Sequence, residues 1–151
     1  MICKKVYVAS DHAGFEAKNE VVRILCELGL DFVDLGTNSA LVSVDYPKYA
    51  KKVCLKVLKD KDFYGILICG SGSGMQIAAN KIKGIRAVFA YDEYSAKMSR
   101  LDNDANILTL RGREFDSKKY FKIIKAFLNT DFSGEKRHIK RVEQIDKLEN
   151  E

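Results

Sequence analysis

The order of apolar and polar positions along the chain predicts strands that alternate with helices. Short apolar runs typical of strands cover residues 5–10, 30–35, 64–69, 85–90 and 107–110. The helical period of apolar positions predicts helices over residues 14–28, 46–58, 75–82, 92–101, 117–128 and 137–148. Strands that are apolar on both faces are typical of a parallel sheet with helices on each side. The pattern therefore predicts a doubly wound α/β fold with five parallel strands.

Nothing along the chain marks a boundary between two domains. There is no low-complexity linker, and Pro47 is the only proline, so we interpret residues 1–151 as one domain. The clearest break is the polar segment 129–134, which separates the last predicted helix, 137–148, from the rest. Our hypothesis is that this extra C-terminal helix packs on a partner subunit.

Composition and charge narrow the classes of partner. No apolar run approaches the ~20 residues that a membrane-spanning helix needs, and the first residues lack the pattern of a signal peptide. We therefore expect a cytoplasmic protein with no membrane partner. The net charge is +5, but the lysines are spread along the predicted helices. This distribution favours a solvated surface with one anion pocket over a nucleic-acid interface.

The cysteines and histidines are too scattered to predict a metal site. Cys3, Cys26, Cys54 and Cys69 share no CxxC or ligand spacing, and His12 and His138 are the only histidines. In a reducing compartment the cysteines are expected to be thiols. Cys26 and Cys54, among apolar positions of predicted helices, are expected to be packing residues. We expect neither a metal nor a cofactor.

Polar residues and glycines collect where the predicted strands end. In doubly wound folds, ligands bind at the carboxyl ends of the strands. The residues at those ends are Ser10, Asp11, His12, Gly36, Thr37, Cys69 to Gly74, Tyr91, Asp92, Arg111, Gly112 and Arg113. The site is therefore expected at this edge of the sheet.

The loop Gly70-Ser71-Gly72-Ser73-Gly74 follows Cys69 directly and predicts an anion site, because glycines let successive N–H groups converge on one ligand. A P-loop has a lysine after its last glycine, and Met75-Gln76 supplies none. A cysteine phosphatase has an arginine a few residues after its nucleophile, and no arginine lies between Cys69 and Arg86. The third glycine comes one residue too early for a dinucleotide fingerprint, although Asp92 keeps that alternative open. A thiol beside a helix N-terminus can ionise near neutral pH, so Cys69 is a candidate base.

A small set of basic residues is suited to a phosphate. Arg137 and Arg141 are spaced i, i+4 and share one helix face, His138 is adjacent, and Arg113 follows the fifth strand. An exposed basic helix face is the alternative, and spacing alone favours it. His12 has the alternative role of capping the first helix.

These residues resemble the type B ribose-5-phosphate isomerase family, which includes allose-6-phosphate and galactose-6-phosphate isomerases. The resemblance runs from Val6 to about Val142. Its blocks are DHAG at 11–14, SVDYP at 43–47, GILICGSGSGM at 65–75, AANK at 78–81, GIRA at 84–87, YSAK at 94–97 and NDAN at 103–106.

The resemblance implies a Rossmann-like three-layer αβα sandwich and a homodimer or dimer of dimers with shared active sites. It implies interconversion of ribose 5-phosphate and ribulose 5-phosphate in the non-oxidative pentose phosphate pathway, without a metal. Cys69 would be the base that moves a proton between C2 and C1. The implied enediolate contacts are Ser71 and the N–H groups of Gly70, Gly72, Ser73 and Gly74. The implied sugar contacts are Asp11, Tyr46 and Asn103, and the implied phosphate contacts are His12, Arg113, Arg137, His138 and Arg141.

The chain departs from the family pattern at two positions. Asp102 stands where many members have a histidine assigned to opening the furanose ring, and Arg111 stands where a glycine is usual. Asp102 can serve in ring opening, His12 can replace it, or opening can be spontaneous. The open alternatives for function are isomerisation of a six-carbon sugar phosphate and sugar-phosphate binding without catalysis.

Overall fold

Five parallel strands form the sheet that carries the site, as the pattern predicted. The computed structural model describes residues 5–150. The strands are β1 (Lys5–Ser10), β2 (Phe32–Asp34), β3 (Phe63–Cys69), β4 (Ala87–Phe89) and β5 (Ile107–Arg111). Their order across the sheet is β2-β1-β3-β5-β4, and every neighbouring pair is parallel. The central position of β3 places its last residue in the middle of the carboxyl edge.

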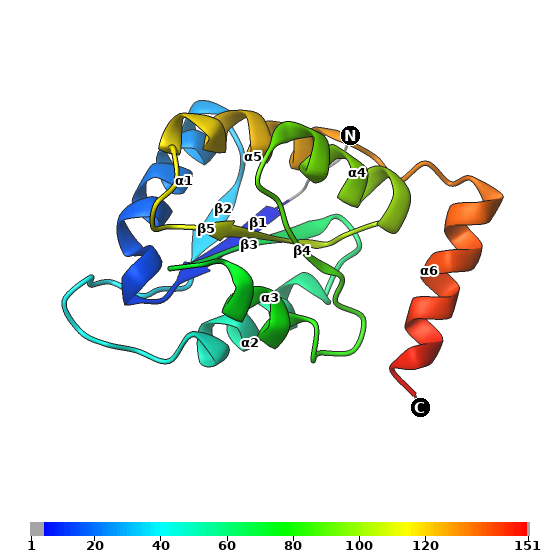
Figure 1. Ribbon diagram of the computed structural model, residues 1–151, viewed down its shortest axis with the longest axis horizontal. Helices are drawn as coiled ribbons and strands as arrows, with labels where there is room; N and C mark the ends of the chain where they lie inside the picture. The colour runs from blue at the N-terminus through cyan, green and yellow to red at the C-terminus, as the bar shows by residue number, and fades with distance from the viewer. Residues whose placement is uncertain (1–4, 151) are drawn as a thin grey trace.

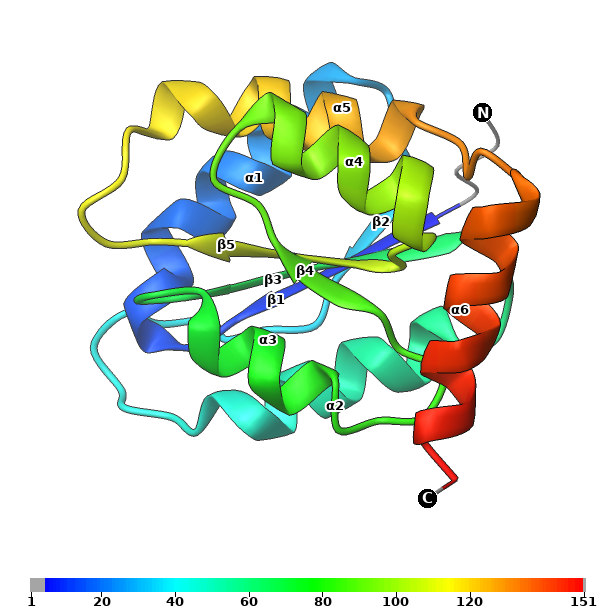
Figure 2. The same cartoon turned by 45° about the vertical axis from the view of Figure 1, so that its right-hand side comes forward.

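Helices cover both faces of this sheet, which confirms the three-layer sandwich (Figures 1 and 2). On one face lie α1 (Phe15–Glu27), α4 (Glu93–Asn103) and α5 (Tyr120–Asn129), and on the other lie α2 (Tyr46–Val57) and α3 (Ser73–Ala79). Short 3₁₀ turns, η1 (His12–Gly14) and η2 (Ser117–Lys119), precede α1 and α5. The last helix, α6 (Lys136–Leu148), stands at the end of the sheet remote from the β3–α3 loop. No helix among residues 5–150 is long and apolar enough to cross a membrane.

The sheet separates two hydrophobic cores, and the alternation of β3 divides its side chains between them. Ile66 and Ile68 pack in the core beneath α1, α4 and α5, whereas Leu67 and Cys69 pack in the core beneath α2 and α3. Successive side chains of a strand point to opposite faces, so this division follows from the period of two. Cys69 therefore faces the α2–α3 layer.

Several element boundaries differ from the predicted ones for local reasons. β2 and β4 have three residues each, shorter than predicted, and both are edge strands with a single neighbour. α3 begins at Ser73, two residues earlier than predicted, so Ser73 and Gly74 belong to its first turn. It ends at Ala79, and the next residue, Asn80, exchanges hydrogen bonds with the backbone of Ala87 at 2.8 and 2.7 Å.

Arg100 is a buried guanidinium that joins three parts of the chain. Its Nη1 donates to the carbonyl of Ala105 at 2.6 Å and to Asp104 Oδ1 at 2.7 Å. Its Nη2 donates to the Tyr64 hydroxyl at 3.0 Å, and its Nε donates to the carbonyl of Thr130 at 3.2 Å. These bonds connect the end of α4 to β3 and to the segment that leads to α6.

We expect Arg100→Met to lower the free energy of unfolding by about 3 kcal/mol, because it removes charge-assisted hydrogen bonds from a buried site. Urea denaturation followed by circular dichroism measures this. Lys97→Met, on the exposed side of the same helix, is the matched control and should change stability by less than ~0.5 kcal/mol. Equal stability of the two variants would contradict the structural role of Arg100.

Candidate active site

Cys69 ends β3 at the centre of the carboxyl edge, and only 4% of its surface is exposed. Its Sγ accepts a hydrogen bond from the backbone N–H of Gly72 at 3.2 Å. An N–H group directed at the sulfur stabilises negative charge there. The residue singled out by the sequence thus lies at the strand end with its sulfur facing the glycine loop.

Gly72 gives the loop its tight return over the cysteine. Its φ is +80°, and a Cβ at this position would lie 2.7 Å from the ring of Phe89. A left-handed conformation and a close approach together require glycine. The loop is also held by the Ser71 hydroxyl, which accepts from the Ser73 N–H at 3.3 Å.

Tyr46 and Arg113 approach this loop from two sides. A Cβ built on Gly74 would lie 2.8 Å from Tyr46 Cζ, and one on Gly70 would lie 3.5 Å from Arg113 Cδ. The backbone N–H of Arg113 also donates to the carbonyl of Gly70 at 3.1 Å. The structure therefore brings both predicted binding residues to the glycine loop.

Asp11 and His12 complete this first group of predicted residues. Asp11 is buried, and its Oδ1 accepts from the Gly14 N–H at 2.9 Å, while its own N–H donates to the carbonyl of Ile68. His12 Nδ1 accepts from the N–H of Val44 at 3.2 Å. Asp11, and not His12, is the residue that caps the first helical turn. His12 instead fixes the loop that leads to Tyr46.

A second group of predicted residues lies at the junction of α4 and α6. His138 is buried, with its Nδ1 2.6 Å from the Ser133 hydroxyl and its Nε2 3.6 Å from Asp102 Oδ1. Arg141 lines a shallow hollow beside Asn103, the last residue of α4. Arg137 is exposed and pairs with Glu135 at 2.8 Å.

Within one chain, the structure does not bring the two groups together. α4 runs antiparallel to the strands, so its last residues lie at the amino edge of the sheet, where the Arg86 carbonyl accepts from the Asn106 N–H. α6 stands at that same end, and the β3–α3 loop lies at the other (Figure 2). A site that uses both groups needs a second chain.

Two expectations about individual residues change. Cys26 is exposed, so its prediction as a packing residue is wrong: its position on α1 faces solvent and not the sheet. Cys54 is buried, as predicted, and Cys3 lies outside the described residues. Asp92 caps α4 by accepting from the Ser95 N–H at 2.7 Å, a bond that lowers the pKa of this carboxyl. That role leaves the dinucleotide alternative without its ribose contact.

Ser133 and Arg111 are two residues whose local roles the sequence did not reveal. Ser133 fixes the ring of His138, and no motif in the sequence marks it. Arg111 donates to the carbonyl of Glu114 and lies over the ring of Phe115, 5.4 Å from its centroid. Arg111 therefore shapes the loop that carries Arg113.

In the described part of the chain, no group of three or more His, Cys, Asp or Glu side chains is placed to hold a metal ion.

Burial raises the pKa of the Cys54 thiol to about 12. Only thiolates alkylate readily, so at pH 8 we expect iodoacetamide to label Cys26 and to leave Cys54 unmodified until urea unfolds the chain. The unfolded chain loses the Cys54 proton near pH 9.0 and the folded chain keeps it to about 12, so the free energy of unfolding falls as pH rises across that interval. Peptide mass spectrometry and urea titrations at both ends of the interval measure these effects. Labelling of native Cys54 as fast as Cys26 would contradict them.

Comparison with known proteins identifies the class. The family model described as Ribose/Galactose Isomerase matches residues 6–145. The chain is 43% identical over 146 residues to ribose-5-phosphate isomerase B of Escherichia coli, covering 97% of each chain. Its fold matches the crystal structure of a ribose 5-phosphate isomerase from Thermotoga maritima with a TM-score of 0.90 at 45% identity, over 95% of this chain and 97% of that one. The type B ribose 5-phosphate isomerase of Trypanosoma brucei matches with a TM-score of 0.91 at 43% identity, over 96% and 98%.

A full-length match of sequence and fold to these enzymes defines the chain as an isomerase. It belongs to the ribose/galactose isomerase family, as the sequence blocks predicted.

Proposed function

We propose that the protein interconverts D-ribose 5-phosphate and D-ribulose 5-phosphate through an enediolate, with Cys69 as the base. The observation that carries this proposal is the Cys69 sulfur at the end of β3, facing the Gly72 N–H inside a loop of backbone donors. Relatives that match over nearly their whole length are named ribose-5-phosphate isomerase B, which supports the choice of substrate. We place the reaction in the non-oxidative pentose phosphate pathway and the protein in the cytoplasm.

The proposed chemistry needs one base and a fixed set of donors. The Cys69 thiolate removes the proton from C2, and the electrons of that C–H bond form the C1–C2 double bond as charge moves to O1. The same sulfur returns the proton to C1, while a proton passes from O2 to O1. We assign Ser71 and the N–H groups of Gly70, Gly72, Ser73 and Gly74 to the oxyanion, which would replace the contacts that the Gly72 and Ser73 N–H groups make in the free protein with Cys69 Sγ and the Ser71 hydroxyl. One such donor is typically worth ~10²–10³ in rate.

We propose further that each site is shared between two copies of the chain. Asp11 and Tyr46 hold the sugar hydroxyls, and His12 and Arg113 bind the phosphate, all from the chain that supplies Cys69. Asn103, Arg137, His138 and Arg141 come from the partner. The separation of the two groups within one chain supports this arrangement. His138 is 3% exposed and its Nε2 lies 3.6 Å from Asp102 Oδ1, so we assign it the support of Asp102 in place of the phosphate contact that the resemblance implied.

A substrate panel tests the assignment. We expect the highest kcat/KM for ribose 5-phosphate and lower values for allose 6-phosphate and galactose 6-phosphate, measured by appearance of the ketose. A higher kcat/KM for a six-carbon substrate would reassign the enzyme within its family. Saturable binding of all three without turnover would refute catalysis and favour a binding protein.

Asp102 is the proposed group for opening the furanose ring. Its side chain is 40% exposed and stands 3.6 Å from His138 Nε2. We expect Asp102→Asn to lower kcat for ribose 5-phosphate by roughly 10²-fold, the usual scale of one acid–base group. A four-carbon aldose phosphate, whose phosphorylated O4 cannot close the ring, should lose far less. Asp102→Glu, which keeps the carboxylate, is the control, and equal losses on both substrates would remove the ring-opening role.

A further inference from the structure

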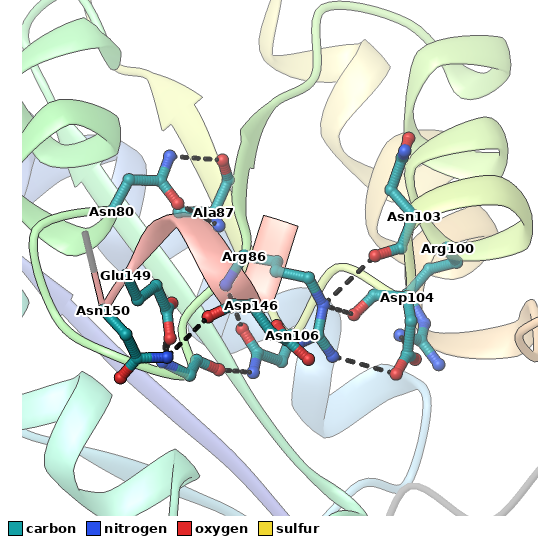
Figure 3. Close-up of polar contacts among 11 residues, drawn as sticks. Asn80, Arg86, Ala87, Arg100, Asn103, Asp104, Asn106, Asp146, Glu149 and Asn150 are labelled. Carbon is teal, nitrogen blue, oxygen red and sulfur yellow. Dashed lines mark hydrogen bonds and ion pairs between the residues drawn. The ribbon is translucent and has the colours of Figure 1, made fainter. Parts of the chain in front are cut away.

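The C-terminal end of α6, including its C-cap residue Glu149 and the following Asn150, is held by polar contacts to the body of its own chain, meaning the sheet with its two helix layers (Figure 3). Both carboxylate oxygens of Glu149 accept from the backbone N–H of Gly84, at 2.8 and 3.0 Å. Lys83 donates to the side chain of Asn150. The turn before β4 thus holds the end of α6, which lies far from it in the sequence.

Arg86, in the same turn, joins α6 to the end of α4. Its Nε donates to the carbonyls of Asn103 and Asp104 at 3.1 and 2.9 Å, and its Nη2 donates to Asp104 Oδ2 at 2.9 Å. Its Nη1 forms an ion pair with Asp146 of α6 at 3.5 Å. One guanidinium therefore contacts both elements that carry the second group of site residues.

Asn106 fixes the turn itself. Its Oδ1 accepts from the Arg86 N–H, and its Nδ2 donates to the carbonyl of Gly84, each at 2.9 Å. The turn that receives Glu149 and carries Arg86 is consequently rigid with respect to the start of β5.

Apolar packing contributes little to the placement of this part of α6. A groove of about 460 Å³ lies between α6 and the body, lined by Ile85, Val88, Ile145 and Leu148 among others. Ile145 is 37% exposed and Leu148 is 65% exposed, so the apolar side of the last turns is not buried against the body. Polar contacts therefore hold the helix: His138 with Ser133 near its start, and Glu149 with Gly84, Asp146 with Arg86 and Asn150 with Lys83 at its end.

We infer that Arg86 and Glu149 are positioning residues that set the angle of α6 and so place Arg141 beside Asn103 for the phosphate-bearing substrate. This inference rests on the proposed function. Without the bonds from Glu149 to Gly84, α6 can tilt about the His138 contact at its other end. Arg141 lies about 4.5 Å along the helix axis from His138, so it moves with that tilt. A shift of roughly 1 Å at Arg141 is enough to misalign a two-point contact with a phosphate.

Substitution at Glu149 tests this placement. For Glu149→Ala we expect the KM for ribose 5-phosphate to rise on the order of fivefold, with a parallel loss of inorganic phosphate binding in calorimetry and kcat within about twofold. Glu149→Gln keeps an oxygen that accepts from the Gly84 N–H and should restore most of the affinity. Glu143→Ala, an exposed position on the same helix, is the control. Equal KM and phosphate affinity in Glu149→Ala and Glu143→Ala would overturn the inference.

A mixed dimer separates placement of α6 from a local defect. In a heterodimer of one Cys69→Ala chain and one Glu149→Ala chain, isolated through different tags, the intact cysteine receives α6 from the Cys69→Ala chain, where Glu149 is present. We expect wild-type KM for this single site. A raised KM there would place the defect in the chain that carries Cys69 and refute the positioning role. Absence of turnover in the wild type would refute the proposed function, and a loss of phosphate binding in Glu149→Ala alone would still support the placement of α6.

Discussion

Replacing Cys69 by alanine is expected to lower kcat by about 10³-fold or more, the range that one acid–base group contributes to an enzyme reaction. The loss should fall on kcat and leave KM within a few-fold, because the sulfur acts on the C2 proton and the remaining contacts bind the substrate. Steady-state kinetics with ribose 5-phosphate measures the effect. Cys69→Ser should retain little activity, because a serine hydroxyl is far less acidic than a thiol and does not ionise near neutral pH to supply an anionic base.

Two controls make the Cys69 result interpretable. Cys26→Ala removes an exposed thiol from α1 and should leave kcat unchanged, which excludes a general effect of cysteine removal. The urea midpoint of Cys69→Ala should stay close to that of the wild type, because the residue is small and lies at the end of its strand. A Cys69→Ala protein that is folded and turns over normally would show that another group is the base.

The second large effect is expected from mixing two inactive variants. If each site takes Cys69 from one chain and Arg137 from the other, a heterodimer of Cys69→Ala and Arg137→Ala contains one intact site and one site with both defects. Random reassociation makes about half of the dimers mixed, and each mixed dimer has one intact site out of two. Activity should therefore return to about a quarter of the wild-type value, measured at substrate concentrations below the KM of the Arg137 variant. Each variant alone should be nearly inactive under those conditions.

The physical reason for this recovery is the distance between the two groups. Arg137 lies on α6, at the end of the sheet remote from the β3–α3 loop, so a site that needs both Arg137 and Cys69 would have to take them from two chains (Figure 1). Co-refolding followed by kinetics and light scattering measures recovery and assembly together. Lys140→Ala, an exposed position on the same helix, replaces Arg137→Ala in the control mixture and should be active before mixing. No recovery from a mixture that forms dimers, or full activity in a monomer, would reject shared sites.

The first half of the site was predictable because it is local in sequence. Cys69 and the glycines after it are consecutive, and their place at a strand end follows from the apolar run before them. Asp11 and Arg113 were predictable for the same reason, since parallel strands bring their carboxyl ends to one edge. Chemistry that lies on neighbouring strand ends is brought together by the topology, and the alternating pattern predicts that topology.

For the second group, at the junction of α4 and α6, the sequence predicted which residues belong to the site but not where they lie in space. The i, i+4 spacing of Arg137 and Arg141 predicts a shared helix face, but it leaves open what that face meets. The residues proposed to orient α6, Glu149 and Arg86, are more than sixty positions apart, and no periodic pattern in the sequence links them. Their pairing depends on where the end of α6 returns to the body of the chain.

Periodicity and contiguous motifs were enough to predict the α/β class, the five parallel strands, the family, and the place of Cys69 and its glycine loop at a strand end. These depend on periodicity and on contiguous residues, which carry their information locally. The packed layers were needed to show that the predicted site residues fall into two groups at opposite ends of the strands, that Cys26 is exposed, and that Glu149 and Asp146 bring the end of α6 into contact with Gly84 and Arg86. The reason is that an antiparallel helix carries its last residues away from the strand end at which it began, and that displacement appears only when the layers are packed.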